Sequence, residues 1–299
     1  MYINHNAMAG NVANTLTSHY SNLATSTQRL SSGLRVNGAS DDAAGLAIRE
    51  LMRADIAALN QGVRNANDAI SLLQTADGAL GVIDEKLIRM KELAEQAATG
   101  TYDSTQRLMI ESEYQAMASE ITRIANATDF NGIKLLDGTL SSATHKGDGT
   151  GHEDGLTSTG KMKIHFGTLN DSAEDYYYIQ IGTATASALG VGNQAVGAAG
   201  ATVSTQQAAQ EALVGINAAI VSKDKIRAHL GALQNRLENT ITNLTTQSEN
   251  LQAAESRISD VDVATEMTNF VRNQILTQSA VAMLAQANSM PQMAMQLIH

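Results

Sequence analysis

The chain contains no cysteine, so disulfide bonds, thiolate metal sites and cysteine nucleophiles are excluded. It also has no tryptophan and three phenylalanines, and aromatic residues make up 3% of its 299 residues. Any core must therefore be built from Leu, Ile, Val, Met and Ala. This mixture suits long packed helices, because Ala lets helices approach closely and has the highest helix propensity.

Positive charge is also scarce, since the formal net charge is −10. This acidity argues against a general nucleic-acid binder and against binding to an anionic membrane. No apolar run reaches the roughly 20 residues that span a bilayer, and the first residues lack the basic start and apolar run of a signal peptide. We therefore expect a chain that is cytoplasmic or that leaves the cell without a cleaved signal.

Both ends of the chain carry apolar or near-apolar residues in alternating steps of four and three, a pattern typical of coiled coils. The N-terminal series is Ala9, Ala13, Leu16, Tyr20, Leu23, Thr27, Leu30 and Leu34, and the C-terminal series is Leu276, Ala280, Met283, Ala287, Met290, Ala294 and Leu297. Pro291 is expected to kink or end the second helix near Met290, because proline lacks a backbone donor and clashes with the preceding turn.

Between the ends, apolar stripes predict three further helices. They cover Met52–Ala94 with a phase slip near Ala76, Ile110–Ile124 with Asp103 or Ser104 as N-cap, and Ile226–Leu251. The middle is rich in Gly, Thr and Ser, and two runs, Lys161–Phe166 and Tyr176–Ile181, read as strands joined by a loop at Asn170 and Asp171. The acidic stretch Lys146–Gly155 lacks metal-ligand spacing, so no metal is expected there.

The helix breakers gather in GLRVNGASDDAAGLAI, residues 33–48. Asn37-Gly38 is a turn signal, and Ser40 or Asp41 is expected to cap a helix that begins near Ala43. Gly45 is expected to let another segment pack closely. This stretch therefore predicts a joint between two long helices.

Each terminal helix should be marginal alone, because ordering about thirty residues costs more than a few seam leucines return. Pairing the two ends still leaves apolar residues facing outward, namely Val12, Val271, Ile275 and Val281. An ordinary intramolecular coiled coil is one interpretation of the heptads. A rod that self-assembles explains the outward apolar faces better.

Five long motifs stand in the following order: LSSGLRVNGASDDAAGLAI (residues 30–48), NQGVRNANDAISLLQTADGAL (60–80), DFNGIKLLDG (129–138), LGALQNRLENTITNL (230–244) and AESRISDVDVATEMTNFVRNQILTQSAVAMLAQAN (254–288). Together they resemble bacterial flagellin over both helical ends. Pattern and resemblance predict a mainly α fold, a long antiparallel helical hairpin or coiled-coil bundle with paired N- and C-termini, plus a small β-containing central insertion.

The resemblance implies a structural subunit, not an enzyme, that is exported unfolded and self-assembles as a homopolymer into the extracellular filament used for motility. The implied parts are a terminal inner-tube domain with the joint (1–42 and 256–299), a helical bundle (43–138 and 203–255), and a variable surface-exposed β-containing insertion (139–202) whose loss assembly should tolerate. The implied partners are the flagellar export apparatus, a chaperone for the C-terminal helix, filament cap and junction proteins, and a host innate-immune receptor. No cofactor, metal, nucleic acid or membrane is expected.

Three sets of candidate residues follow. The expected inner-layer polymer interface comprises Leu16, Leu23, Leu30, Met267, Phe270, Leu276, Met283 and Leu284, and the joint comprises Gly33, Asn37, Gly38, Asp41, Asp42 and Gly45. The surface around LIRMKELAEQ resembles the flagellin surface that the receptor recognises, which implies Arg89, Leu93 and Glu113 as receptor contacts. The same patch could instead contact the next subunit along the filament.

Two other functions share part of this pattern. A hook–filament junction protein would share the terminal helices but form only a short layer, and the complete motifs at residues 60–80 and 254–288 favour the filament subunit. A signalling coiled coil, such as the cytoplasmic part of a chemoreceptor, predicts a membrane span or an uninterrupted hairpin, and the glycine-rich middle opposes it. No catalytic residues converge, because the sequence contains neither a nucleophile elbow nor a P-loop.

Overall fold

The computed structural model describes residues 6–141, 160–171, 174–193, 195 and 197–298. Contacts divide the chain into two compact units, which we call the terminal unit (residues 1–56 and 248–299) and the central unit (residues 57–247). The finer division into three parts expected from the sequence remains a prediction.

The terminal unit contains α1 (Ala7–Ser32), the first turns of α2 (Ala43–Ala98), the end of α5 (Gln206–Ser259), and α6 (Val263–Ile298). Both heptad series therefore form helices, as predicted, except that Leu34 lies beyond α1 and forms an isolated β-bridge with Asp260. Helix α1 begins at Asn6, whose side chain accepts the Ala9 N–H, and ends at Gly33, whose positive φ of 73° allows its N–H to reach the Arg29 carbonyl.

The expected end of the C-terminal helix near Met290 is wrong, because α6 continues through Pro291 to Ile298. A proline at this position deprives the carbonyl of Ala287 of its usual intrahelical donor. The Asn6 side-chain amide donates to that carbonyl at 2.8 Å. The partner helix thus satisfies the group that proline leaves free, which lowers the cost of continuing the helix.

The central unit is built on α2, α5 and α3 (Ser104–Ala127). Asp103 caps α3, and Gln106 completes a capping box, which confirms one of the two predicted caps. The predicted phase slip near Ala76 is wrong, because Ala76 lies fully buried in an unbroken heptad pattern. The two buried rows of α2 are Ala66, Leu73, Leu80, Leu87 and Ala94, and Ala69, Ala76, Ile83, Met90 and Ala97.

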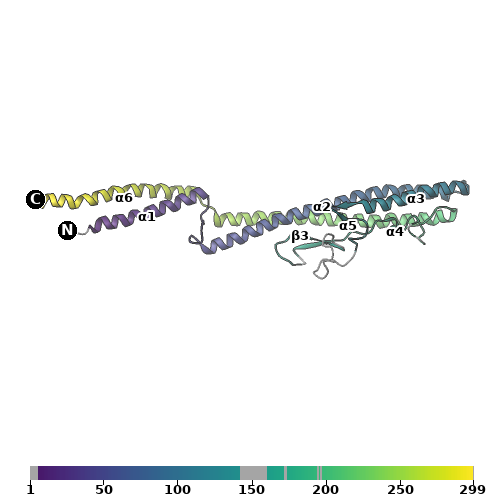
Figure 1. The fold of residues 1–299 in the computed structure, drawn as a ribbon, viewed down its shortest axis with the longest axis horizontal. Helices are drawn as coiled ribbons and strands as arrows, with labels where there is room; N and C mark the ends of the chain where they lie inside the picture. The colour runs from purple at the N-terminus through teal and green to yellow at the C-terminus, as the bar shows by residue number, and fades with distance from the viewer. Residues whose placement is uncertain (1–5, 142–159, 172–173, 194, 196, 299) are drawn as a thin grey trace. The chain divides into compact units, whose positions relative to one another are not determined.

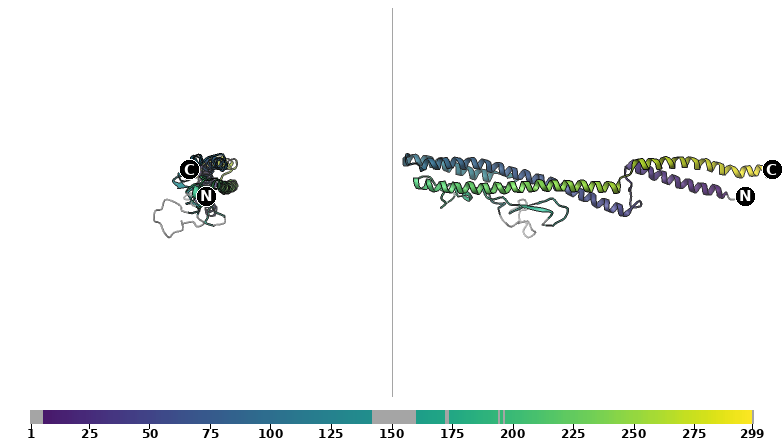
Figure 2. Two further views of the ribbon diagram at one scale, coloured as in Figure 1. Left: turned by 90° about the vertical axis from the view of Figure 1, so that its right-hand side faces the viewer. Right: turned by 180° about the vertical axis from the view of Figure 1, so that it is seen from behind.

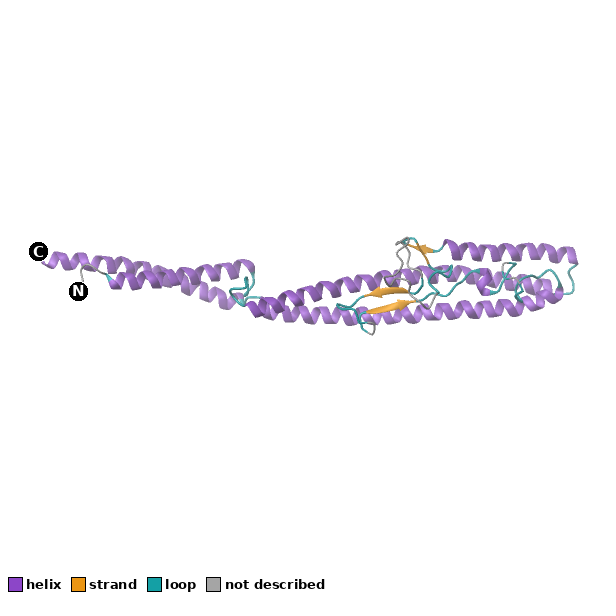
Figure 3. Cartoon of the chain, turned by 60° about the horizontal axis from the view of Figure 1, so that its bottom comes forward, coloured by secondary structure: helices purple, strands orange, loops and turns teal. Residues whose placement is uncertain are grey.

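The insertion carries the predicted strands, β3 (Met162–His165) and β4 (Tyr176–Ile179), paired antiparallel. The hairpin lies along the bundle helices (Figure 3). Asn65 on α2 donates to the His165 carbonyl at 2.8 Å, and Arg236 on α5 lies 3.6 Å from the centre of the Tyr177 ring. Gly62 permits this docking, since a Cβ there would collide with the Phe166 carbonyl.

Three short elements were not predicted from the sequence. Strands β1 (Asp129–Phe130) and β2 (Ile133–Lys134) form a hairpin whose two-residue loop, Asn131 and Gly132, has positive φ at both positions. Helix α4 (Ala186–Leu189) is a single turn. The Asn-Gly dipeptide between apolar residues was the available signal for the hairpin.

The insertion also contributes to the core, which argues against the expectation that assembly tolerates its loss. Its residues Leu140, Ile179, Ile181, Ala184, Leu189 and Val191 are buried in the same cluster as the rows of α2. The Tyr114 hydroxyl of α3 donates to the Gly200 carbonyl at 2.6 Å, and burial raises the pKa of that hydroxyl. The stretch Lys146–Gly155 lies outside the described residues.

Candidate functional site

The terminal helix pair, α1 with α6, brings the two ends of the chain together in antiparallel orientation (Figure 1). The helices also lie side by side when seen from behind (Figure 2). At one end Asn6 bonds to Ala287, and at the other Arg29 lies 3.9 Å from the carboxylate of Glu266. The predicted pairing of the termini is therefore confirmed.

The interior of the terminal unit differs in kind from the interior of the central unit. Among its described residues, Val36 is the largest buried apolar side chain, and the others that are buried are Ala280 and Ala287. The buried polar side chains include Ser26, Glu266 and Thr277. The helices therefore pack through small and polar side chains, so most of their large apolar side chains still contact water.

The residues predicted for the polymer interface lie on this pair with unequal exposure. Leu16, Leu23, Leu30, Phe270 and Leu284 are half-buried, whereas Met267, Leu276 and Met283 are exposed. Val271, Ile275 and Val281 are exposed on α6, as predicted, but Val12 is half-buried. The single chain does not test contacts with other copies, so the interface assignment remains a prediction.

The joint follows α1 directly, and its two aspartates have different roles. Asp41 accepts the N–H groups of Asn37 and Gly38 at 3.1 and 3.2 Å, so it closes the turn. Asp42 caps α2, because its side chain accepts the Gly45 N–H at 2.8 Å while its carbonyl accepts the Leu46 N–H. The prediction that Ser40 or Asp41 would cap this helix is therefore wrong.

Gly45 has a different role from the one expected. A Cβ at this position would collide with the carboxylate of Asp42, so the missing side chain makes room for the cap itself. It does not serve the close approach of another segment. The two residues thus act together at the start of α2.

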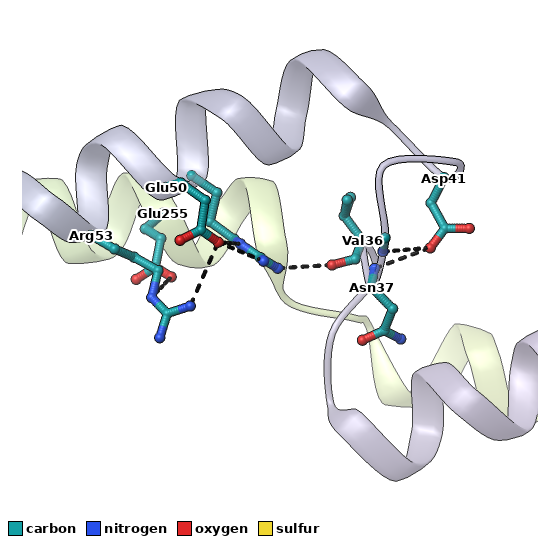
Figure 4. A network of polar contacts seen from close by, with 8 residues as sticks. Val36, Asn37, Asp41, Glu50, Arg53 and Glu255 are labelled. Carbon is teal, nitrogen blue, oxygen red and sulfur yellow. Dashed lines mark hydrogen bonds and ion pairs between the residues drawn. The ribbon is translucent and has the colours of Figure 1, made fainter.

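A buried arginine, which sequence reasoning missed, ties the joint to α2 (Figure 4). Arg49 donates to the Val36 carbonyl at 2.9 Å and makes a second contact with Glu50 at 2.8 Å. The hydrogen bond from Arg49 lowers the pKa of Glu50. Arg49 lies seven residues before Ile56 of the apolar stripe, and a charge at that position was the available signal.

Backbone and ionic contacts close the joint against the α5–α6 connection. Arg35 donates from its side chain to the Ile258 carbonyl at 2.6 Å, and the Val261 N–H donates to the Gly33 carbonyl at 3.0 Å. Arg53 lies 3.9 Å from Glu255 on α5. The joint is therefore held on both chain segments that meet there.

The patch around Arg89 is only partly as predicted. Arg89 donates to Glu113 at 2.7 and 3.0 Å and pairs with Glu92 at 2.9 Å, so the two predicted charged residues face each other on α2 and α3. These bonds raise the pKa of the Arg89 guanidinium. Leu93 is 1% exposed and belongs to the core of the central unit. Its expected position at the surface is wrong, because Leu93, next to Ala94 of a buried row, packs into the core as well.

Among the described residues, no three His, Cys, Asp or Glu side chains are grouped to hold a metal ion. No helix in the described part is both long and apolar enough to cross a bilayer.

The chain is similar to known proteins at both of its helical ends. Residues 3–141 match the bacterial flagellin N-terminal helical region, and residues 213–298 match the bacterial flagellin C-terminal helical region. The chain is 43% identical to the flagellin of Bacillus subtilis and 40% identical to a flagellar filament 33 kDa core protein of Treponema phagedenis, with 100% of both chains covered in each case. A crystal structure of Bacillus cereus flagellin matches 64% of this chain and 94% of its own at 30% identity, with a TM-score of 0.46.

Proposed function

Because the chain belongs to the bacterial flagellin family, we propose that its terminal helix pair is the surface through which copies pack into a filament. Flagellins are structural proteins that polymerise, so the chain is a subunit of the flagellar filament and not an enzyme. One observation carries the assignment of the surface. Among its described residues, the terminal unit buries no apolar side chain larger than Val36, while Met267, Val271 and Met283 stay exposed.

The terminal helix pair needs contacts with other copies because ordering two long helices costs conformational entropy. A long helix pair that buries mainly alanine and polar groups gains little from its own contacts. Apolar side chains left in water are stabilised when neighbouring copies cover them. The three parts then take distinct places: residues 1–42 with 256–299 line an inner tube, residues 43–138 with 203–255 surround it, and residues 139–202 face outward.

The low stability of the terminal helix pair on its own also supports the proposed export of the chain and its proposed partners. Ends that gain little from folding alone stay unfolded at low cost, which suits unfolded export through the flagellar apparatus to the outside of the cell. Before export, a chaperone that covers the apolar residues of α6 would keep them from aggregating. Cap and junction proteins would contact the same helix pair at the two ends of the filament.

A hook–filament junction protein is the alternative. It would have the same terminal helices, but the full-length match at 40–43% identity is to filament proteins, which favours the filament subunit.

For the patch around Arg89 we propose a contact between copies along the filament in preference to a receptor contact. Ile88, one residue before Arg89, and Met109, one turn before Glu113, are exposed apolar residues. Such residues beside a charge pair are typical of a subunit interface. With Leu93 buried, receptor binding would depend on Arg89 and Glu113.

Deleting the residues after Ile275 tests the main proposal. The shortened protein should remain soluble, keep the helices of its central unit by circular dichroism, and fail to form filaments after salt-induced polymerisation, as seen by electron microscopy. The intact chain under the same conditions is the control and should form long tubes. Normal filaments from the shortened chain would contradict the interface assignment.

A further inference from the structure

One buried row of α5 contains a lysine where the pattern calls for an apolar residue. The row consists of Ile216, Lys223, Leu230, Leu237 and Leu244, each seven residues apart. Lys223 is 2% exposed, so its side chain lies inside the core of the central unit. A buried ammonium costs solvation free energy, and such a residue calls for a reason other than packing.

The lysine is held by specific partners. Its Nζ lies 2.6 Å from Asp84 on α2 and 2.7 Å from Asp224 on its own helix. One turn further on, Arg227 makes two bonds to Asp77, at 2.7 and 3.2 Å. Burial lowers the pKa of Lys223, but the bonds to Asp224 and Asp84 outweigh burial and raise it, so the ammonium is charged at neutral pH.

The apolar rows of the helix opposite do not by themselves select one alignment. The two buried rows of α2 repeat apolar residues every seven positions over five heptads. If α5 slid along α2 by seven residues, apolar side chains would still meet apolar side chains. Such a slip moves the chain by about 10 Å, at about 1.5 Å per residue.

The charged residues distinguish the observed alignment from the two alignments that a one-heptad slip would give, which the apolar rows do not. A slip in one direction brings Lys223 opposite Lys91, seven residues after Asp84, so two like charges meet. A slip in the other direction brings Lys223 to Asp77, but it leaves Asp84 without its cation and places Arg227 opposite Ile70. Only the observed alignment pairs both cations with both acids.

We propose that Lys223, with Arg227, sets the heptad register in which α5 pairs with α2. A single polar residue in a core row is known to select the register of a coiled coil at some cost in stability. The proposal concerns the folding of the central unit and does not depend on filament assembly.

The register can be measured as a distance, because the chain has no cysteine and accepts specific spin labels. Ser71 on α2 and Ser222 on α5 are both exposed, and Ser→Cys is nearly isosteric. Their positions differ by about 20 Å along the helix axis, since Lys223 lies beside Asp84. A one-heptad slip would add or remove about 10 Å of this axial separation.

The test variant is Lys223→Met, which shortens the unbranched side chain by one atom and removes the charge. After unfolding and refolding, double electron–electron resonance should show a second distance population, while the denaturation midpoint is unchanged or higher. Leu230→Met is the matched control, because it changes the same row one heptad away and removes no charge. It should show one distance.

A second variant removes the charges that pair with Lys223 and Arg227 on the other helix, α2. Asp77→Asn with Asp84→Asn removes both acceptor charges at partly exposed positions, so folding does not depend on filling a cavity. It should also show two distances. A single native distance in either folded variant overturns the proposal.

Discussion

Replacing Ile275 by serine should raise the concentration at which the protein begins to polymerise. Ile275 is 56% exposed on α6 in the single chain. Burying an isoleucine side chain completely stabilises by about 1.5–3 kcal/mol, so about half of this, ~0.8–1.5 kcal/mol, remains available to a contact between copies. A factor of ten corresponds to about 1.4 kcal/mol, so the critical concentration should rise about 4- to 12-fold.

The substitution is chosen so that other effects stay small. Serine and isoleucine have similar helix propensities, so the change acts mainly on the apolar contact. The assay is sedimentation of filaments after salt-induced polymerisation over a series of protein concentrations. Circular dichroism of the unpolymerised protein checks that its helix content is unchanged.

Leu169→Ser supplies the matched control. Leu169 is 75% exposed and lies between β3 and β4, in the part proposed to face outward. Its substitution should leave the critical concentration unchanged. Equal critical concentrations for Ile275→Ser and the unaltered protein would show that α6 does not bury this face between copies, and the assignment of the terminal helix pair would be refuted.

Four further predictions concern particular contacts. Asp42→Ala should destabilise the start of α2 by about 1 kcal/mol in thermal unfolding, whereas Asp42→Ser should restore most of the loss. Asn6→Asp keeps the cap of α1 but removes the donor to α6, so hydrogen exchange near Ala287 should accelerate. Replacing residues 139–200 by a short turn should lower the unfolding midpoint, because it removes core side chains. Hydrogen bonds from the Thr265 hydroxyl and backbone lower the pKa of Asp262. The stabilisation that the Asp262 carboxylate provides is therefore present above the pKa of the unfolded state and is lost as the pH falls through the pKa of the folded state. In Thr265→Val, carboxyl NMR should show that the pKa of Asp262 moves up.

Each of these has an outcome that would contradict it. An unchanged pKa of Asp262 in Thr265→Val would mean that the threonine hydroxyl does not stabilise the carboxylate. Equal melting of Asp42→Ala and Asp42→Ser would mean that the cap contributes nothing. Unchanged exchange in the Asn6 variant, with Pro291→Ala as a companion that restores the backbone donor, would remove the explanation for the uninterrupted helix. An unchanged unfolding midpoint in the variant without residues 139–200 would mean that the insertion does not stabilise the core.

How far the sequence predicts the site depends on whether a feature is local. The heptads correctly placed helices at both ends, and the glycines and the Asn-Gly turn correctly placed the joint. The prediction of Ser40 or Asp41 as cap was wrong, because Ser and Asp both suit a cap position and the turn geometry selects Asp42. Leu93 was misplaced because the resemblance suggested a surface, and because it lies outside the two buried heptad rows, so their spacing did not indicate its burial.

The sequence by itself determined which segments are helical, where the chain turns and which family it belongs to. It could do so because helix propensity, heptad spacing and turn residues act over a few neighbouring positions. The tertiary structure alone decided that Asn6 compensates for Pro291, that Lys223 finds its acid on another helix, and that the insertion packs into the core. These depend on residues that lie far apart in the sequence, such as Asn6 and Ala287, 281 positions apart, and Lys223 and Asp84, 139 positions apart. A side chain's burial or pairing is set by the partner that the fold brings to it.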